Sequence, residues 1–145
     1  MPVKTIEHPK ITTKDAAGSV NGFLVPIVNV HDPTPEAAQW PKQVYLTVVQ
    51  PGKVKGPHLH HERWGLFTCI VGNARIVVRT GTGYEEYLTG VDHKFRTIQV
   101  PAGTPAALQN IGDVDAYILN MPSPAWHFDD QDEHAVSFDD YEFRF

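Results

Sequence analysis

The sequence of 145 residues predicts a single all-β domain, built as a sandwich or a barrel. Its 12 prolines and 11 glycines fall between short apolar runs, as they do in proteins whose strands are separated by turns. A hydrophobic content of 41% and a charged content of 20% are ordinary for a globular domain. The chain is also long enough to bury a core of its own.

The N-terminal part of the chain gives the weakest strand signals. Residues 1–22 are a polar lead-in for which we expect little order. Residues 23–30 are a strand candidate, but Pro26 has no backbone donor and restricts this strand to a sheet edge or a bulge. Residues 34–40 have the pattern of one helical turn, and residues 43–49 are the next predicted strand.

The middle of the chain carries the clearest local signal. Residues 66–71 and 74–79 are two apolar runs separated by a Gly-Asn pair, which predicts a hairpin with a two-residue turn. A glycine-rich turn at residues 80–83 leads into a strand at 84–88.

Two further turns divide the rest of the predicted barrel. Residues 95–100 have the pattern of a strand, and residues 101–105, which contain two prolines, break it. Residues 106–110 and 116–121 then form the last predicted pair of strands, around a Gly-Asp turn.

Residues 122–145 form an acidic and aromatic C-terminal segment. We interpret its carboxylates as a solvated surface. Its aromatic side chains are too numerous for a disordered tail, so we expect them to cover the barrel or a partner subunit.

Composition and charge exclude several classes of function. A net charge of −5 argues against nucleic acid, because phosphate binding needs a basic face. No stretch is long and apolar enough for a membrane span or for the core of a signal peptide. The single cysteine, Cys69, leaves no intramolecular disulfide, so the cytoplasm is the expected location.

The candidate functional residues centre on two histidines, His58 and His60, ahead of the apolar run at 66–71. Residues two apart on a strand point to the same face, so these imidazoles would project together. If this face lines a barrel, the pair predicts either a metal site or a proton-transfer site.

The histidines belong to a segment that resembles the first motif of the cupin family. This motif runs His-x-His, three or four residues, Glu, six residues, Gly. Here His58-Leu59-His60 is followed after four residues by Gly65, and Gly72 falls six residues later. The spacing matches, and glycine stands where the motif has glutamate.

A later segment resembles the second cupin motif, which runs Pro-x-Gly, two residues, His, three residues, Asn. Here Pro101-Ala102-Gly103 is followed at these spacings by Ala106 and Asn110, so alanine replaces the third histidine. The resemblance implies a cupin-type jelly-roll β-barrel as a single domain over residues 1–145.

The two replaced ligands bear on metal binding. A tight divalent site generally needs three or four protein ligands, so two histidines alone hold a metal weakly. We therefore expect neither a metal nor another cofactor. The alternative is a metal-dependent cupin that recruits a spare donor, His61 or Glu62, with His58, His60 and Glu62 as the expected ligands.

Within the cupins, the chain is more similar to the metal-free branch that acts on nucleotide-linked keto sugars. Lys55-Gly56-Pro57-His58 resembles the Arg-Gly-x-His of the 4-keto-6-deoxysugar 3,5-epimerases. With His60 it resembles the Arg-Gly-x-His-x-His of the sugar 3,4-ketoisomerases. The resemblance implies epimerisation or keto-isomerisation of a nucleotide-linked 4-keto-deoxysugar.

Such a reaction removes a proton next to the sugar ketone, and a neutral histidine is a suitable base. His58 is the expected base, and His60 would donate a hydrogen bond, relay the proton or fix the tautomer of His58. The enolate needs a donor beside its oxygen. Tyr45 and Tyr117 are the candidates, and the alternative for each is a core tyrosine with a bonded hydroxyl.

Substrate contacts are expected from cationic, aromatic and amide side chains. Arg75 and Arg79 share one face of a predicted strand and would bind a diphosphate, unless that face is simply solvated. Trp64 would stack on a base or sugar, or pack in the core. The other expected contacts are Lys55, Arg63 and Asn110.

An open jelly roll with an aromatic-rich tail has edges and apolar surface to cover. We therefore expect a homodimer, with the N-terminal strand or the tail at its interface. A cupin that binds a sugar or metabolite without turning it over remains an alternative function.

Overall fold

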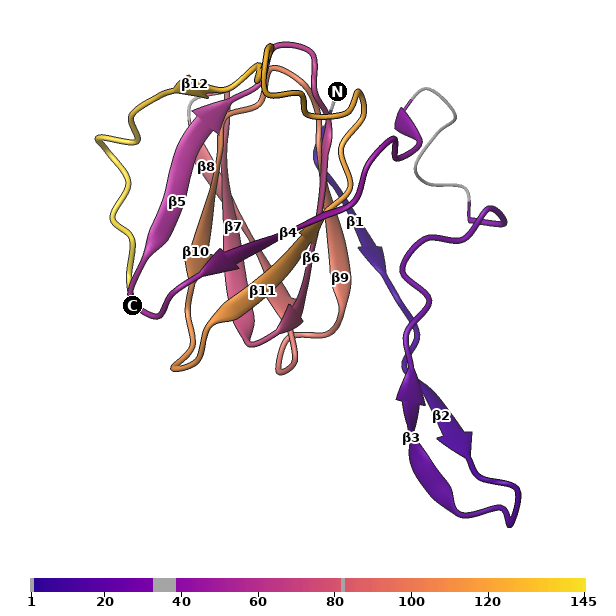
Figure 1. Ribbon diagram of the computed structural model, residues 1–145. Coiled ribbons are helices and arrows are strands. Elements are labelled where there is room, and N and C mark those ends of the chain that lie inside the picture. The colour runs from indigo at the N-terminus through magenta and orange to yellow at the C-terminus, as the bar shows by residue number, and fades with distance from the viewer. Residues whose placement is uncertain (1, 33–38, 82) are drawn as a thin grey trace.

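The structure is a computed structural model, and it describes residues 2–32, 39–81 and 83–145 (Figure 1). Antiparallel strands make up its regular structure. They are β1 (Lys4–Glu7), β2 (Ile11–Lys14), β3 (Val20–Leu24), β4 (Tyr45–Val49), β5 (Val54–Leu59), β6 (Gly65–Val71), β7 (Asn73–Thr80), β8 (Gly83–Gly90), β9 (Arg96–Val100), β10 (Ala106–Asn110), β11 (Ala116–Asn120) and β12 (His134–Ala135).

Two five-stranded sheets face each other and form the barrel (Figure 1). The first has the order β1-β9-β6-β11-β4 and the second has the order β12-β5-β10-β7-β8. The all-β barrel predicted from the sequence is therefore confirmed. No helix among the described residues is long and apolar enough to cross a membrane.

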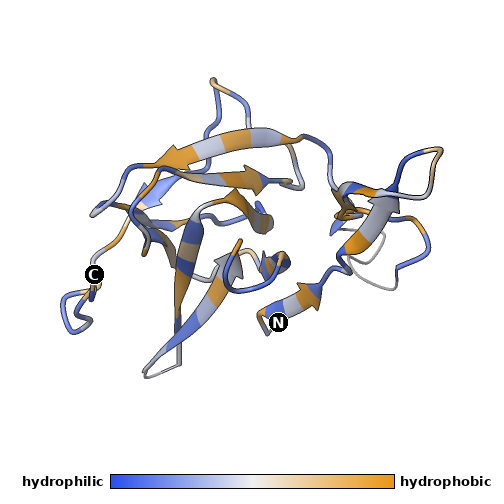
Figure 2. Cartoon of the chain, turned by 90° about the horizontal axis from the view of Figure 1, so that it is seen from below, coloured by the Kyte–Doolittle hydropathy of each residue, from blue (hydrophilic) through white to orange (hydrophobic). Residues whose placement is uncertain are grey.

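The core lies between the sheets, because side chains alternate along each strand. On β11, Ala116 and Ile118 point inward and are fully buried, whereas Tyr117 between them faces outward. Hydrophobic and hydrophilic bands alternate along the strands in the same way (Figure 2). The main core contains Val49, Phe67, Cys69, Ala74, Ile76, Val78, Ile98, Val100, Ala116 and Ile118.

The predicted hairpin at residues 66–79 is wrong, although both of its strands exist. β6 lies between β9 and β11 in the first sheet, and β7 lies between β10 and β8 in the second. The chain crosses between sheets at Gly72, which has a φ of 72°. A Cβ there would lie 2.9 Å from the carbonyl oxygen of Asp115. This glycine therefore makes a tight corner where the sequence pattern indicated a hairpin turn.

The predicted pairing of residues 106–110 with 116–121 is also wrong, because β10 and β11 lie in opposite sheets. Asn110 holds this corner from inside. Its Nδ2 donates to the carbonyls of Val49 (2.8 Å) and Val114 (2.7 Å), and its Oδ1 accepts from the N–H of Gly112 (2.8 Å). Asn110 is fully buried, so it is a structural residue and not a substrate contact.

The N-terminal lead-in, for which little order was expected, forms strands. β1 pairs with β9 at the edge of the first sheet. β2 and β3 form a separate two-stranded hairpin that projects away from the barrel (Figure 1). The strand expected at 23–30 ends at Leu24, and the helical turn expected at 34–40 falls mostly outside the described residues.

The C-terminal segment covers the outer face of the second sheet. Phe138 is buried there, with its ring centroid 5.0 Å from that of Tyr84. Arg75 and Arg79 share this outer face, as predicted, but both hold the segment in place. Their Nη1 atoms donate to the carbonyls of Arg144 and Ser137 respectively, each over 3.0 Å. The expected diphosphate site at these arginines is therefore wrong, because the chain itself occupies the face.

Candidate active site

A cavity of about 490 Å³ lies at one end of the barrel, between the two sheets. The first sheet contributes Tyr45, Thr47, Gly65, Phe67, Val100 and Asn120, and the second contributes Lys55, His58, Ala106 and Leu108. The connecting segments contribute Gln43, His60, Arg63, Pro101, Trp126 and Glu133.

His58 and His60 both line this cavity, as the His-x-His spacing predicted. His58 lies near the end of β5 and pairs with Ala106 of β10. The N–H of Gly103 donates to the carbonyl of His60 over 2.7 Å, so the two cupin-like motifs meet here. Gly56, with a φ of 87°, is required because a Cβ there would lie 2.9 Å from the backbone nitrogen of His58.

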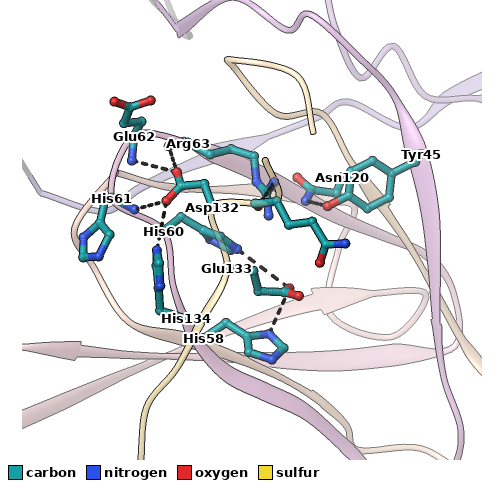
Figure 3. Close-up of polar contacts among 11 residues, drawn as sticks. Tyr45, His58, His60, His61, Glu62, Arg63, Asn120, Asp132, Glu133 and His134 are labelled. Atoms are coloured by element: carbon teal, nitrogen blue, oxygen red, sulfur yellow. Dashed lines mark hydrogen bonds and ion pairs between the residues drawn. The ribbon is translucent and has the colours of Figure 1, made fainter. Parts of the chain in front are cut away.

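The two imidazoles share one carboxylate, that of Glu133 (Figure 3). Its Oε1 lies 3.3 Å from Nδ1 of His58 and 4.0 Å from Nε2 of His60. Glu133 precedes β12, which pairs with β5, and that pairing brings it to the cavity. Glu133 keeps 39% of its side chain exposed, as expected for a solvated carboxylate, but it also lines the cavity, which the sequence pattern did not indicate.

His60 is held in its neutral form. Burial, and next the positive charge of Arg63, lower its pKa to about 4, against the raising effect of the Glu133 and Asp132 carboxylates. Its Nε2 is buried and has no hydrogen-bond partner among the described residues. A buried ring nitrogen without a partner is available to a ligand that enters the cavity.

Asp132 fixes the loop that follows His60. Its Oδ1 accepts from the N–H of His61 (2.8 Å), and its Oδ2 accepts from those of Glu62 (2.8 Å) and Arg63 (3.0 Å) (Figure 3). Partial burial acts to raise the pKa of Asp132, but these N–H groups outweigh it and hold that pKa at about 2. The carboxylate is therefore ionised at neutral pH and the loop is fixed to it.

Other polar groups stand around the cavity. The Nδ2 of Asn120 donates to the hydroxyl oxygen of Tyr45 over 2.6 Å, so the phenolic proton remains free to be donated. The buried Arg63 donates through Nη1 to the carbonyl of Gln131 over 2.9 Å and also lines the cavity. Lys55 and Trp126 add a cation and an aromatic face.

Not all of the predicted site residues meet here. His58, His60, Tyr45, Lys55 and Arg63 line the cavity. Tyr117 lies on the outer face of the first sheet with 37% of its surface exposed, so it is no donor to this site. Trp64 is outside the lining too, and its backbone forms a bridge with Ser123.

The residues present do not fit a metal ion. A Cβ on Gly65 would lie 2.5 Å from the ring of Phe67, so this ring fills the space where the cupin glutamate would stand. Opposite His58 there is only the methyl group of Ala106. The side chain of Glu62 points away from both histidines (Figure 3). Among the described residues, no group of three or more His, Cys, Asp or Glu side chains is placed to hold a metal.

Four residues at or beside the cavity were not predicted from the sequence: Glu133, Asp132, Asn120 and Trp126. Asn120 had a detectable signal, because it is a polar residue at an inward position of an otherwise apolar strand. The two acidic residues had none that separates them from the neighbouring carboxylates.

One family of known sequences matches most of this chain. The sequence profile described as polysaccharide biosynthesis C-terminal domain matches residues 36–134. A search of curated protein sequences found no match.

Solved structures of low sequence identity share the fold. A dTDP sugar isomerase from Desulfovibrio desulfuricans is 17% identical with a TM-score of 0.75, over 94% of this chain and 85% of that chain. The 3,5-epimerase RmlC from Legionella pneumophila is 16% identical with a TM-score of 0.74, and the match covers 95% of this chain and 74% of that chain. The 3,4-ketoisomerase QdtA from Thermoanaerobacterium thermosaccharolyticum is 17% identical with a TM-score of 0.66, and the match covers 88% of this chain and 85% of that chain. The chain therefore belongs to the polysaccharide biosynthesis C-terminal domain family and has the fold of the RmlC-like cupins.

Proposed function

We propose that this protein is an epimerase or keto-isomerase that acts on a nucleotide-linked 4-keto-deoxysugar without a metal. The observation that carries the proposal is the pair of imidazoles, His58 and His60, which share the carboxylate of Glu133 inside an open cavity. This arrangement suits the removal and return of a proton next to a ketone.

His58 is the proposed base. When its Nδ1–H faces the Glu133 carboxylate, 3.3 Å away, the tautomer is fixed and Nε2 is left unprotonated. This nitrogen takes the proton from the carbon beside the ketone. The imidazolium that forms is then stabilised by the same carboxylate.

His60 and Tyr45 are the proposed partners of the developing enolate. His60 is neutral because its pKa is lowered to about 4, so it can donate a hydrogen bond or pass a proton on. Tyr45 accepts from Asn120 and keeps its own proton for the enolate oxygen. Glu133 lies 3.3 Å from Nδ1 of His58 but 4.0 Å from Nε2 of His60, so it pairs with His58 and leaves the His60 nitrogen open to the substrate.

The proposed substrate class rests on the cations and the aromatic residue of the cavity. Lys55 and Arg63 would bind the diphosphate, and Trp126 would stack on the base or the sugar. Solved structures of the same fold support this class. The Thermoanaerobacterium ketoisomerase was solved with TDP, and the Legionella epimerase with dTDP-4-keto-L-rhamnose.

Solvent exchange tests the proposal. A nucleotide-linked 4-keto sugar incubated with the protein in deuterium oxide should gain deuterium at C3 or C5. His58→Asn should lower this rate by about a hundredfold to ten-thousandfold, the usual loss for a positioned base, and His60→Asn should lower it less.

His61→Asn is the matched control, because the His61 ring packs against that of His134 outside the cavity, with the centroids 4.3 Å apart, and its loss should leave exchange unchanged. Binding of the sugar nucleotide without exchange in the unmodified protein would instead favour a cupin that only binds. Exchange that survives in His58→Asn would show that another residue is the base.

We also propose a homodimer that uses the β2–β3 hairpin. A two-stranded sheet alone is marginally stable in water, and this one exposes Val20 (66%), Phe23 (49%) and Leu24 (48%). Light scattering at micromolar concentration should give twice the mass of the chain. A double variant, Phe23→Ser with Leu24→Ser, should shift it towards the monomer. A monomeric unmodified protein would contradict this proposal.

The cytoplasmic location stays a prediction.

A further inference from the structure

Glu133 is attached on both sides to the segment that carries the two histidines. Directly before it, Asp132 binds the backbone of the loop that follows His60. Directly after it, β12 pairs with β5, and His134 and Ala135 lie opposite Leu59 and His58. The position of the Glu133 backbone relative to His58 therefore depends on these two attachments.

The attachment through Asp132 is tight. Both of its carboxylate oxygens accept hydrogen bonds from backbone N–H groups, over 2.8 Å, 2.8 Å and 3.0 Å. The backbone of Asp132 has a φ of 43°, a left-handed conformation that residues other than glycine rarely adopt. Such a conformation persists only where the surroundings hold it, and here the bonds to the loop do so.

Asp132 is not among the residues that line the cavity, so it is not placed to touch a substrate. Its bonds instead connect Glu133 with the loop that begins after His60 and ends at Arg63. A shift of this connection would move the Glu133 carboxylate away from Nδ1 of His58.

We propose that Asp132 is a positioning residue that holds Glu133 in contact with His58. The proposal rests on the proposed function for its kinetic consequence, but the contact itself can be measured without a substrate. On the His58 contact Asp132 acts through Glu133, so its loss has no further effect on that contact once the Glu133 carboxylate is gone.

Asp132→Asn is the sharpest substitution. Asparagine keeps the shape and one acceptor oxygen, but its amide group cannot accept the hydrogen bonds from Glu62 and Arg63 that Oδ2 accepts now. The amide group of the new asparagine would face the backbone N–H groups of Glu62 and Arg63, all of them donors, and the loop that follows His60 would move away. Asp130→Asn is the matched control, since it removes the same charge from the same segment, and Asp130 contacts the chain through its backbone bond to His127.

The kinetic experiment compares exchange rates in deuterium oxide. At saturating substrate, Asp132→Asn should lower the rate by about tenfold to a hundredfold, as a misplacement near 1 Å does. KM should rise as well, because the loop that moves carries Arg63, a proposed diphosphate contact. Asp130→Asn should leave the rate unchanged. At saturating substrate, the double variant Asp132→Asn with Glu133→Gln should be no slower than Glu133→Gln alone, because both changes act on the same contact with His58. If the rate losses of the two single variants multiply in the double variant, the two residues act independently and the proposal is wrong.

The second readout needs no turnover. Ring nitrogen resonances of His58, recorded by nuclear magnetic resonance, should shift alike in Glu133→Gln and Asp132→Asn and stay unchanged in Asp130→Asn. If Asp132→Asn leaves the His58 resonances unchanged, the proposal is wrong. If they shift as expected while the unmodified protein shows no exchange, the positioning role stands and the proposed reaction fails. Should Asp132→Asn not fold, Asp132→Ser, which adds no amide donor, takes its place in both experiments.

Discussion

The two ends of the barrel both bury polar side chains, but they differ in how these side chains are paired. Two buried atoms away from the cavity lining, Nε of Arg75 and Oε1 of Gln99, also lack a hydrogen-bond partner among the described residues. At the closed end, Asn110 makes three hydrogen bonds to the backbone around the corner. Asn73 makes two more with Asp92, one from Nδ2 and one to Oδ1, each 2.8 Å long. At the open end, Nε2 of His60 has no partner among the described residues.

Whether a buried polar group is paired distinguishes a structural residue from a candidate functional one better than its residue type does. Asn110 and His60 both belong to cupin-like motifs and both are largely buried. Buried polar groups are normally paired, and one that is unpaired beside a cavity is open to a ligand. At the closed end, the hydrogen bonds of the buried polar side chains stabilise the fold. At the open end, the unpaired Nε2 of His60 is available to a ligand.

The largest effect on stability is expected from the closed end. Asn110→Ala leaves two carbonyls and one N–H without their partner, and each such buried group costs about 1 to 3 kcal/mol, so we expect a loss of about 4 kcal/mol in the free energy of unfolding. Denaturant unfolding measures it, with the exposed Asn21→Ala as control.

In the cold, where Asn110→Ala is still folded, its exchange rate with a keto sugar should match that of the unmodified protein. A variant that is stable but inactive would break the comparison between the two ends.

A smaller effect is expected at the open end, and it depends on pH. The pKa of His60 is about 4 in the folded protein and near 6.5 in the unfolded chain. Between these values the unfolded chain binds more protons, so acid favours unfolding. From pH 7 to pH 5 the free energy of unfolding should fall by about 2 kcal/mol through this residue. Burial also lowers the pKa of His8, which acts in the same direction.

Unfolding of His60→Gln at the two pH values sharpens the comparison. This variant should lose the His60 part of the slope and keep the part that comes from His8. The exposed His31→Gln should keep the whole slope. An unchanged slope in His60→Gln would mean that this imidazole is not held neutral, which would weaken its proposed role.

The strands and part of the cavity could be predicted from the sequence because they depend on local patterns. Short runs of strand-forming residues between turn residues mark β4, β6, β7, β9, β10 and β11, and the His-x-His spacing places His58 and His60 together. Strand partners could not be predicted, because a glycine turn such as that at Gly72 has the same sequence pattern whether it closes a hairpin or crosses between sheets.

Contacts between distant segments explain the remaining errors. The shared face of Arg75 and Arg79 follows from strand periodicity, but the segment that covers it comes from the far end of the sequence. Glu133 is one carboxylate among several in an acidic stretch. Only the pairing of β12 with β5 selects it for the cavity.

The corner at Gly72 has a consequence for how the chain reaches this fold. In the described barrel, β7 and β8 are the only strands adjacent in sequence that also pair with each other. Every other barrel pairing joins strands that are separated in sequence by at least two other strands, so a long segment of chain must close, at a cost in entropy, before the pair forms. A topology of this kind folds slowly. We therefore expect folding to start at the β7–β8 hairpin, and the cavity to form only when the last long-range pairings close around it.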